Sequence, residues 1–328
     1  METSHKGGET MKKKIITLSL IGALCIVSIM AGCGQANSNI DNNSEEVIIA
    51  EEEVPLANSS VKVLEPSAPG TTTYKENDVI VDASNINQGY VMIKYNGKNQ
   101  KIKIQIAKGS GTTYTYNLNA RDAYEVFPLT DGDGNYSMKV FQNTSGAKYS
   151  QVFSKNINVK LANQYLPFLY PNQYVNFNAD SKTVKKAIEV TKSTSDDLKK
   201  VELVYDYTVD TLTYDKVKAA NVQSGYVPNV DAVLACKKGI CFDYASVMTT
   251  MLRSQNIPCK LVVGYTGNVY HAWINVYTPE SGWVDGMIFF DGKKWQLMDP
   301  TYASSGKKSE SIMKYIGDSS NYTAKYAY

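Results

Sequence analysis

The feature that most constrains this 328-residue chain is a change in hydrophobic periodicity near residue 163. Over 61–162, short β-prone runs alternate with turn residues, which is typical of an antiparallel sandwich. Beyond the prolines at 167 and 171, apolar residues recur at helical spacing and later alternate again. A chain of this length has room for about two domains. We therefore predict an N-terminal antiparallel, immunoglobulin-like β-sandwich over 61–162, followed by an α+β domain over 163–328.

Strand patterns in the first half are strongest at 90–95 and 101–106, where Ile102, Ile104 and Ile106 would share one buried face. These two runs flank Asn96-Gly97, a dipeptide that favours a tight hairpin. Further strands are expected at 113–118, 124–129, 136–143 and 149–159. We expect this module to be a spacer or a binding domain.

The acidic run from Asp131 to Asn135 has some features of a calcium loop. Tyr136 stands where that motif requires glycine, and Gln142 where it requires a bidentate glutamate. A plain turn is therefore the favoured interpretation of this segment.

The N-terminus has the pattern of an export signal. Lysines at 12–14 precede an apolar run over 15–30, which is shorter than a membrane span usually needs. The run ends in Met30-Ala31-Gly32-Cys33, which resembles a bacterial lipobox. We predict a lipoprotein signal peptide over 1–32, lipidation of Cys33, and a protein anchored to the cell membrane on its extracellular side. The alternatives are an ordinary signal peptide or an uncleaved anchor, and the start could be Met1 or Met11.

Residues 33–60 are rich in Asn, Ser and Glu and lack hydrophobic periodicity, so we predict a flexible tether. The formal net charge is only +2, which argues against nucleic acid as a partner. Scattered cysteines with a single histidine beyond the signal give no metal-ligand spacing. We predict neither a metal nor another cofactor.

Helical patterns open the second half. One short helix is expected over 181–191, and Thr194 to Asp197 resembles a capping box that opens a second. The second helix carries an apolar stripe, and a polar loop over 221–229 follows it. A third helix should begin near Cys241 and end near Gln255. Gly239 would let the chain bend before it, and a cysteine in a first turn is in a position that favours the thiolate.

Two strands are then expected at 260–265 and 270–277, joined by a turn at 266–268. Alternation would place His271, Trp273 and Asn275 on one face of the second strand. A third strand should end at 296–301, after a hairpin turn at Asp291-Gly292.

Cys241 and His271 form the candidate catalytic pair. A cysteine nucleophile needs a histidine to take its proton and an acid or amide to orient that histidine. The chain contains two histidines, and His5 lies in or before the export signal. His271 is therefore the only imidazole expected in the mature protein.

Four ordered motifs resemble the transglutaminase-like superfamily: 239–245 around Cys241, 255–265, His271-Ala272-Trp273, and Asp299-Pro300-Thr301. The resemblance covers roughly 183–302 and implies a papain-like α+β core. Matched residue by residue, it implies Cys241 as nucleophile, His271 as general base and acid, and Asp299 as the orienting carboxylate. Asp285 is a rival third member, without the Pro-Thr context. The backbone N–H of Cys241 would serve the oxyanion hole, with Tyr214 as a candidate second donor.

The resemblance implies thioester chemistry on protein or peptide carboxamides, by transfer to an amine or by hydrolysis. With an exported location, cell-wall-associated substrates are expected. The competing interpretation is a non-catalytic envelope binding or scaffold lipoprotein. Cys236 and Cys259 could pair in an oxidising compartment, although we expect both to be free structural thiols.

Overall fold

The computed structural model describes residues 63–279, 282–284, 288–290, 295–297, 300–301, 304 and 318–328. The predicted signal peptide, the tether, Cys33, Asp285 and Asp299 lie outside these residues. No helix within the described ranges is long and apolar enough to cross a membrane.

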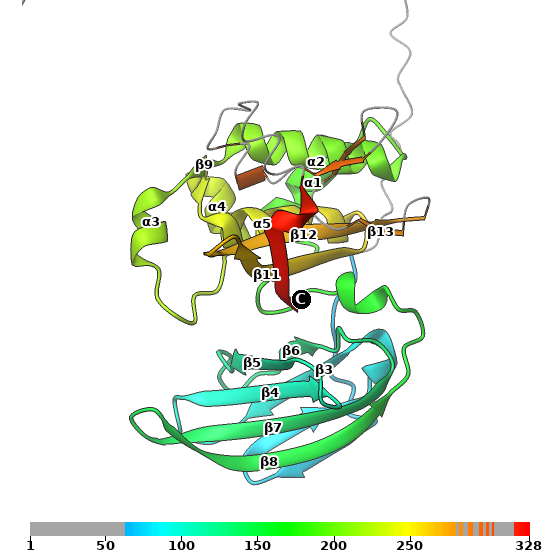
Figure 1. The fold of residues 1–328 in the computed structure, drawn as a ribbon. Coiled ribbons are helices and arrows are strands. Elements are labelled where there is room, and N and C mark those ends of the chain that lie inside the picture. The colour runs from blue at the N-terminus through cyan, green and yellow to red at the C-terminus, as the bar shows by residue number, and fades with distance from the viewer. Residues whose placement is uncertain are drawn as a thin grey trace, which may run out of the picture. The chain divides into compact units, whose positions relative to one another are not determined.

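The strands of the N-terminal half form two four-stranded antiparallel sheets (Figure 1). The first has the order β1-β2-β3-β6, with bounds Thr73–Glu76, Val79–Asp82, Tyr90–Tyr95 and Glu125–Pro128. The second has the order β5-β4-β7-β8, with bounds Thr113–Asn117, Ile102–Lys108, Gly134–Ser145 and Lys148–Val159. Ile102, Ile104 and Ile106 are buried on one face of β4, as the alternation predicts. The predicted antiparallel sandwich is therefore present.

The predicted hairpin across Asn96-Gly97 is wrong. Strand β3 pairs with β2 and β6, whereas β4 pairs with β5 and β7, so the segment between β3 and β4 passes from one sheet to the other. The Asn96 N–H instead donates to the carbonyl of Asp78 at 2.9 Å. Neither turn residue has the positive φ that the predicted turn requires.

The continuously described helices of the second half are α1 (Lys182–Thr191), α2 (Asp197–Thr211), α3 (Lys216–Asn221), α4 (Val230–Cys236) and α5 (Cys241–Ser254). The cap of α2 differs from the prediction, because the carboxylate of Asp196 accepts the N–H of Lys199. Thr194 instead accepts the N–H of Asp196 outside the helix. The predicted polar loop over 221–229 is confirmed apart from its first residue, since residues 222–229 join α3 to α4. The sequence analysis missed these two helices.

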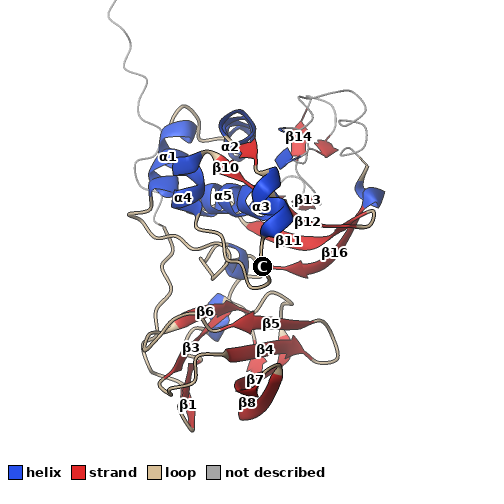
Figure 2. Cartoon of the chain, turned by 90° about the vertical axis from the view of Figure 1, so that its left-hand side faces the viewer, coloured by secondary structure: helices blue, strands red, loops and turns tan. Residues whose placement is uncertain are grey.

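A four-stranded antiparallel sheet with the order β13-β12-β11-β16 packs against the helices. Its strands are Gly282–Val284, Val269–Thr278, Cys259–Thr266 and Tyr322–Ala327. Figure 2 shows α1, α4 and α5 side by side next to this sheet, with β16 at its end. The predicted hairpin between β11 and β12 is confirmed. Strands β14 (Ile288–Phe290) and β15 (Trp295–Leu297) form a separate antiparallel pair.

Helix α5 is the centre of this half. Every residue from Asp243 to Ser254 is buried, because α5 packs against α1, α2, α4 and the strands β11 and β12. Near its end, the buried Arg253 guanidinium donates to the main-chain oxygens of Cys259, Tyr170 and Tyr328. These charge-assisted bonds offset the cost of burying the cation and hold three distant segments together.

Tyrosines join the two halves. Tyr114 and Tyr116 on β5 pack edge-on against Tyr328, with ring centroids 5.7 and 5.9 Å apart. Tyr116 also stacks on Tyr174 at 6.0 Å. The Gln173 amide donates to the carbonyl of Asn117 and to the carboxylate of Glu125. Residues of both halves belong to one continuous hydrophobic cluster, and the predicted boundaries at 60 and 162 remain predictions.

The burial of the Cys259 thiol can be tested through the pH dependence of the protein's stability. Burial raises the pKa of its thiol from 9.0 to about 12, and the Thr249 hydroxyl and the Arg253 charge only partly oppose that rise. Because the folded-state pKa exceeds the unfolded one, the neutral thiol contributes stability below pH 9 that is lost as pH rises towards 12. Between pH 8 and 10.5, wild type should lose roughly 2 kcal/mol of unfolding free energy relative to Cys259→Val. Urea unfolding at both pH values measures this difference, and equal losses in the two proteins would contradict it.

Candidate active site

Cys241 is the first residue of α5, and its side chain is half-buried. Ile240 precedes it in an extended conformation, so the chain turns into the helix at the cysteine. The first backbone N–H groups of a helix have no acceptor inside that helix, and the helix dipole makes its N-terminus electropositive. The structure thus confirms that a helix begins at Cys241, and the role of Cys241 as nucleophile stays a prediction.

Gly239 is needed for space rather than for an unusual φ. It forms the short strand β10 (Lys238–Gly239), which pairs in parallel with β9 (Thr213–Tyr214). A Cβ at Gly239 would lie 2.6 Å from the Cβ of Asp243, closer than two carbon atoms can approach. The pairing places Tyr214 opposite Gly239 in the register, next to the start of α5.

His271 lies on β12 and is buried. The predicted alternation holds, because Ala272, Ile274 and Val276 belong to the hydrophobic core while His271 stacks with Trp273 at 6.3 Å. Tyr322 on β16 also contacts both rings. Aromatic neighbours thus hold the imidazole at the start of a long, paired strand.

Cys241 and His271 line one cavity of about 580 Å³. Tyr214 lines the same cavity. Its other described lining residues are Tyr174, Ala219, Val222, Gln223, Ser224, Gly225, Tyr226, Ile240, Phe242, Val263, Val269, Tyr270, Ala272 and Tyr328. Apart from the imidazole, none of these described side chains is a carboxylate or a basic group. The arrangement offers a thiol and an imidazole to a neutral, partly apolar ligand.

The third catalytic member stays a prediction, since Asp299 and its rival Asp285 lie outside the described residues. The neighbours of Asp299 in sequence, Pro300 and Thr301, are buried. Farther along, the hydroxyl of Ser304 donates to the carbonyl of Leu212 and lies 2.9 Å from the hydroxyl of Tyr244 in α5.

Asp243, in the first turn of α5, connects this helix to a neighbouring loop. Its fully buried carboxylate accepts the N–H of Ile240 at 2.8 Å and pairs with Lys218 of α3 at 2.6 Å. Tyr226 donates its hydroxyl to the same carboxylate at 2.5 Å. Burial, and then the hydrogen bond to Asp243, raise the pKa of the Tyr226 phenol well above its usual value. Three segments are thereby fixed around one charge.

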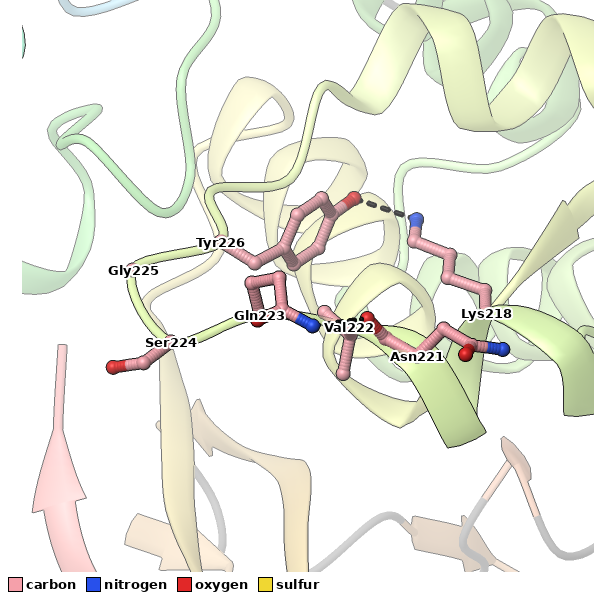
Figure 3. Close-up of a pocket in the computed structure, with 7 residues that line it drawn as sticks. All are labelled: Lys218, Asn221, Val222, Gln223, Ser224, Gly225 and Tyr226. Carbon is pink, nitrogen blue, oxygen red and sulfur yellow. Dashed lines mark hydrogen bonds between the residues drawn. The ribbon is translucent and has the colours of Figure 1, made fainter.

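Figure 3 shows the Tyr226 hydroxyl directed at the Lys218 ammonium, with loop residues 222–225 between α3 and Tyr226. This loop also borders a second cavity of about 480 Å³, lined by Lys218, Asn221 and residues 222–226. Because residues 222–226 line both cavities, the loop forms a wall between them.

Several lining residues escaped the sequence analysis. Tyr174 and Tyr328 lie far from Cys241 in sequence and reach the cavity only through the tertiary fold. Tyr270 was assigned only to a strand. Tyr270 lines the same cavity as Cys241, and burial raises the pKa of its phenol. The one sequence feature that could have indicated that Tyr270 lines the cavity is its position next to His271.

The other two described cysteines are unpaired, as expected: Cys236 is exposed and Cys259 is buried. The three described thiols thus occupy three different environments, and among them only Cys241 lines the cavity that His271 also lines.

Comparison with known proteins finds sequence similarity over the segment that contains Cys241 and His271. Residues 184–300 match the family model of the transglutaminase-like superfamily. The chain is 31% identical over 117 residues to "Uncharacterized protein YebA" of Bacillus subtilis, covering 30% of this chain and 16% of that protein. It is 28% identical over 94 residues to a protein-glutamine gamma-glutamyltransferase of Pseudomonas aeruginosa, covering 24% and 12%. The chain therefore spans less than a fifth of the length of these two curated relatives.

Among solved structures, the periplasmic domain of TgpA from Pseudomonas aeruginosa aligns with a TM-score of 0.33 and 13% identity. The alignment covers 74% of this chain and 99% of that domain.

The close approach at Gly239 makes Gly239→Ala informative. The added methyl must displace Asp243, so we expect a loss of about 1–3 kcal/mol in unfolding free energy and slower alkylation of Cys241. Gly111→Ala, where the new Cβ would meet a single backbone oxygen at 3.0 Å in an exposed turn, is the control. Urea unfolding and mass-spectrometric labelling measure both effects. Equal behaviour of the two variants would refute a steric role for Gly239.

The Lys218–Asp243 pair can be tested against an exposed pair of the same type. Lys218→Met leaves a buried carboxylate without its cation, so unfolding free energy should fall by about 1–3 kcal/mol. Lys199→Met breaks the exposed pair with Glu202 and should cost at most about 0.5 kcal/mol. Adding Asp243→Asn to Lys218→Met should recover part of the loss. If the Lys218 and Lys199 variants lose the same unfolding free energy, the buried pair stabilises the fold no more than the exposed pair does.

Proposed function

Because residues 184–300 form a domain of the transglutaminase-like superfamily, we propose that the protein is a cysteine-dependent enzyme acting on protein or peptide carboxamides. The superfamily includes cysteine acyltransferases and peptidases. The observation that carries the proposal is the shared cavity of Cys241 and His271, with the cysteine at a helix N-terminus.

The proposed reaction begins when the Cys241 thiolate attacks the carboxamide carbon. A C–S bond forms, the C–N bond breaks, and the departing nitrogen takes a proton from the His271 imidazolium as ammonia or an amine. The developing oxyanion would accept the backbone N–H of Cys241. Tyr214, which lines the cavity, is the proposed second donor.

An acceptor then resolves the thioester. A primary amine or water attacks the carbonyl carbon while giving a proton to His271, the C–S bond breaks, and the thiolate is restored. An amine acceptor makes the enzyme a transferase, and water makes it a hydrolase. Asp299 is proposed to orient His271, as the family motif implies.

The N-terminal motif extends the proposal to location. Lipidation of Cys33 would anchor the chain to the membrane on its extracellular side, and the tether over 33–60 would let the folded part reach envelope proteins or peptides. The support for this part is the sequence pattern around Met30 to Cys33.

Cysteine reactivity tests the proposed nucleophile. In the full-length chain at pH 6.5, iodoacetamide should label Cys241 at least about tenfold faster than the exposed Cys236, because the proposed mechanism has His271, which lines the same cavity, take the thiol proton. His271→Ala should remove this advantage. Asn275→Ala, which changes a buried polar side chain farther along β12, should leave it intact. Peptide mass spectrometry gives each rate. Equal labelling of Cys241 and Cys236 in wild type would support a non-catalytic scaffold.

The same preparation distinguishes transfer from hydrolysis. A glutamine-containing protein is incubated with the enzyme and a fluorescent primary amine, and both amine incorporation and ammonia release are measured. Incorporation that accounts for the ammonia indicates transfer, whereas ammonia release with glutamate formation indicates hydrolysis. Cys241→Ala is the blank for both measurements.

A further inference from the structure

Exposed apolar side chains are concentrated around the mouth of the Cys241 cavity. The described part of the chain exposes six large hydrophobic side chains: Ile188, Val217, Val222, Tyr265, Val269 and Tyr270. Val222, Val269 and Tyr270 line the cavity itself. Exposed apolar groups clustered at a cavity mark a binding surface more often than scattered ones do.

The remaining members, apart from Ile188, adjoin these three. Tyr265 lies opposite Tyr270 in the β11–β12 register, and their rings are in edge contact at 5.4 Å. Val217 lies on α3, the helix that contributes Ala219 to the cavity lining. We call Val222, Tyr265, Val269 and Tyr270 the apolar rim. Its members come from the 222–226 loop and from the β11–β12 hairpin.

We propose that the apolar rim is a specificity subsite that binds apolar side chains flanking the reactive carboxamide of a polypeptide substrate. This inference rests on the proposed function for its substrate class. A carboxamide that reaches Cys241 remains attached to its own chain, so the neighbouring residues of that chain must lie at the cavity mouth. There they meet Val269 and Tyr270, which are 60% and 55% exposed.

The absence of charged side chains from the described cavity lining also favours apolar flanking side chains. The described cavity lining contains no carboxylate and no lysine or arginine, so a charged flanking residue would lose water without gaining an ionic partner. An apolar side chain would instead cover exposed rim surface, and burial of such surface is favourable in proportion to its area. The apolar rim therefore disfavours charged flanking side chains and favours apolar ones.

The test uses full-length Cys241→Ala protein, so that binding is measured without chemistry. Two fluorescein-labelled peptides of equal length and charge each carry one central glutamine, flanked by Leu and Phe in one and by Ser and Thr in the other. Fluorescence polarisation should give about tenfold tighter binding of the apolar peptide. Val269→Ser combined with Tyr270→Ser should abolish this preference, and Val222→Ser, on the opposite segment, should reduce it independently.

Ile188→Ser is the matched control, because Ile188 is an exposed large hydrophobic residue on α1 that is not among the residues lining the cavity. It should retain the full preference. Equal affinity for both peptides, or a preference that survives in the rim variants, would overturn the subsite.

The result of this binding test can be distinguished from the result of the labelling test of the proposed function. A peptide preference together with unreactive wild-type Cys241 would leave the rim as a binding site and reject the enzyme. Reactive Cys241 without a preference would keep the enzyme and reject the rim.

Discussion

The carboxylate of Asp243 has no solvent exposure and is bonded from three directions at the first turn of α5. Burial of an unpaired carboxylate would cost several kcal/mol, so the fold at this point is stable only with its partners in place. Those partners are the Ile240 N–H, the Lys218 ammonium and the Tyr226 hydroxyl, which belong to three different segments. One charge therefore fixes the turn into the nucleophile helix, the end of α3, and the loop that forms a cavity wall. The same constraint explains Gly239, since a larger residue would push this carboxylate away.

The N-terminal half packs against the loop over 222–226 that forms the cavity wall. A Cβ at Gly225 in the loop would lie 2.8 Å from the amide nitrogen of Asn117 on β5, so the loop passes directly against the sandwich. Tyr114 and Tyr116 of the same strand pack on Tyr328, and Tyr328 and Tyr174 line the cavity. Burial raises the pKa of the Tyr174 phenol to about 12. A role only as a spacer does not account for these contacts.

Local patterns predicted strands β3 to β8 of the sandwich, helices α1, α2 and α5, and the β11–β12 hairpin, because each depends on side chains close in sequence, whereas the short strands β1 and β2 were missed. Asn96-Gly97 shows the limit of such patterns: the dipeptide permits a hairpin, but the pairing of β3 with β2 and β6 excludes it. Helices α3 and α4 are only six and seven residues long, too short for an amphipathic repeat to be recognised. For the candidate site, the sequence motifs predicted Cys241 and His271. Tyr174, Tyr226 and Tyr328 could not be predicted, since only tertiary packing brings them to the cavity.

The cavity lining also bears on which acceptor can resolve the proposed thioester. A primary amine is mostly an ammonium ion at neutral pH, and the described lining offers no carboxylate to replace the water that an ammonium loses on entry. An amine must therefore lose its proton before it reaches the thioester, either in solvent or to an acid-base group at the site. Water needs no such step, although a substrate bound at the apolar rim would limit the access of water to Cys241. The balance between transfer and hydrolysis thus depends on two opposing desolvation effects: removal of the amine's charge and exclusion of water by the rim. A substrate whose flanking side chains cover Val269 and Tyr270 would strengthen the second effect and shift the balance towards transfer.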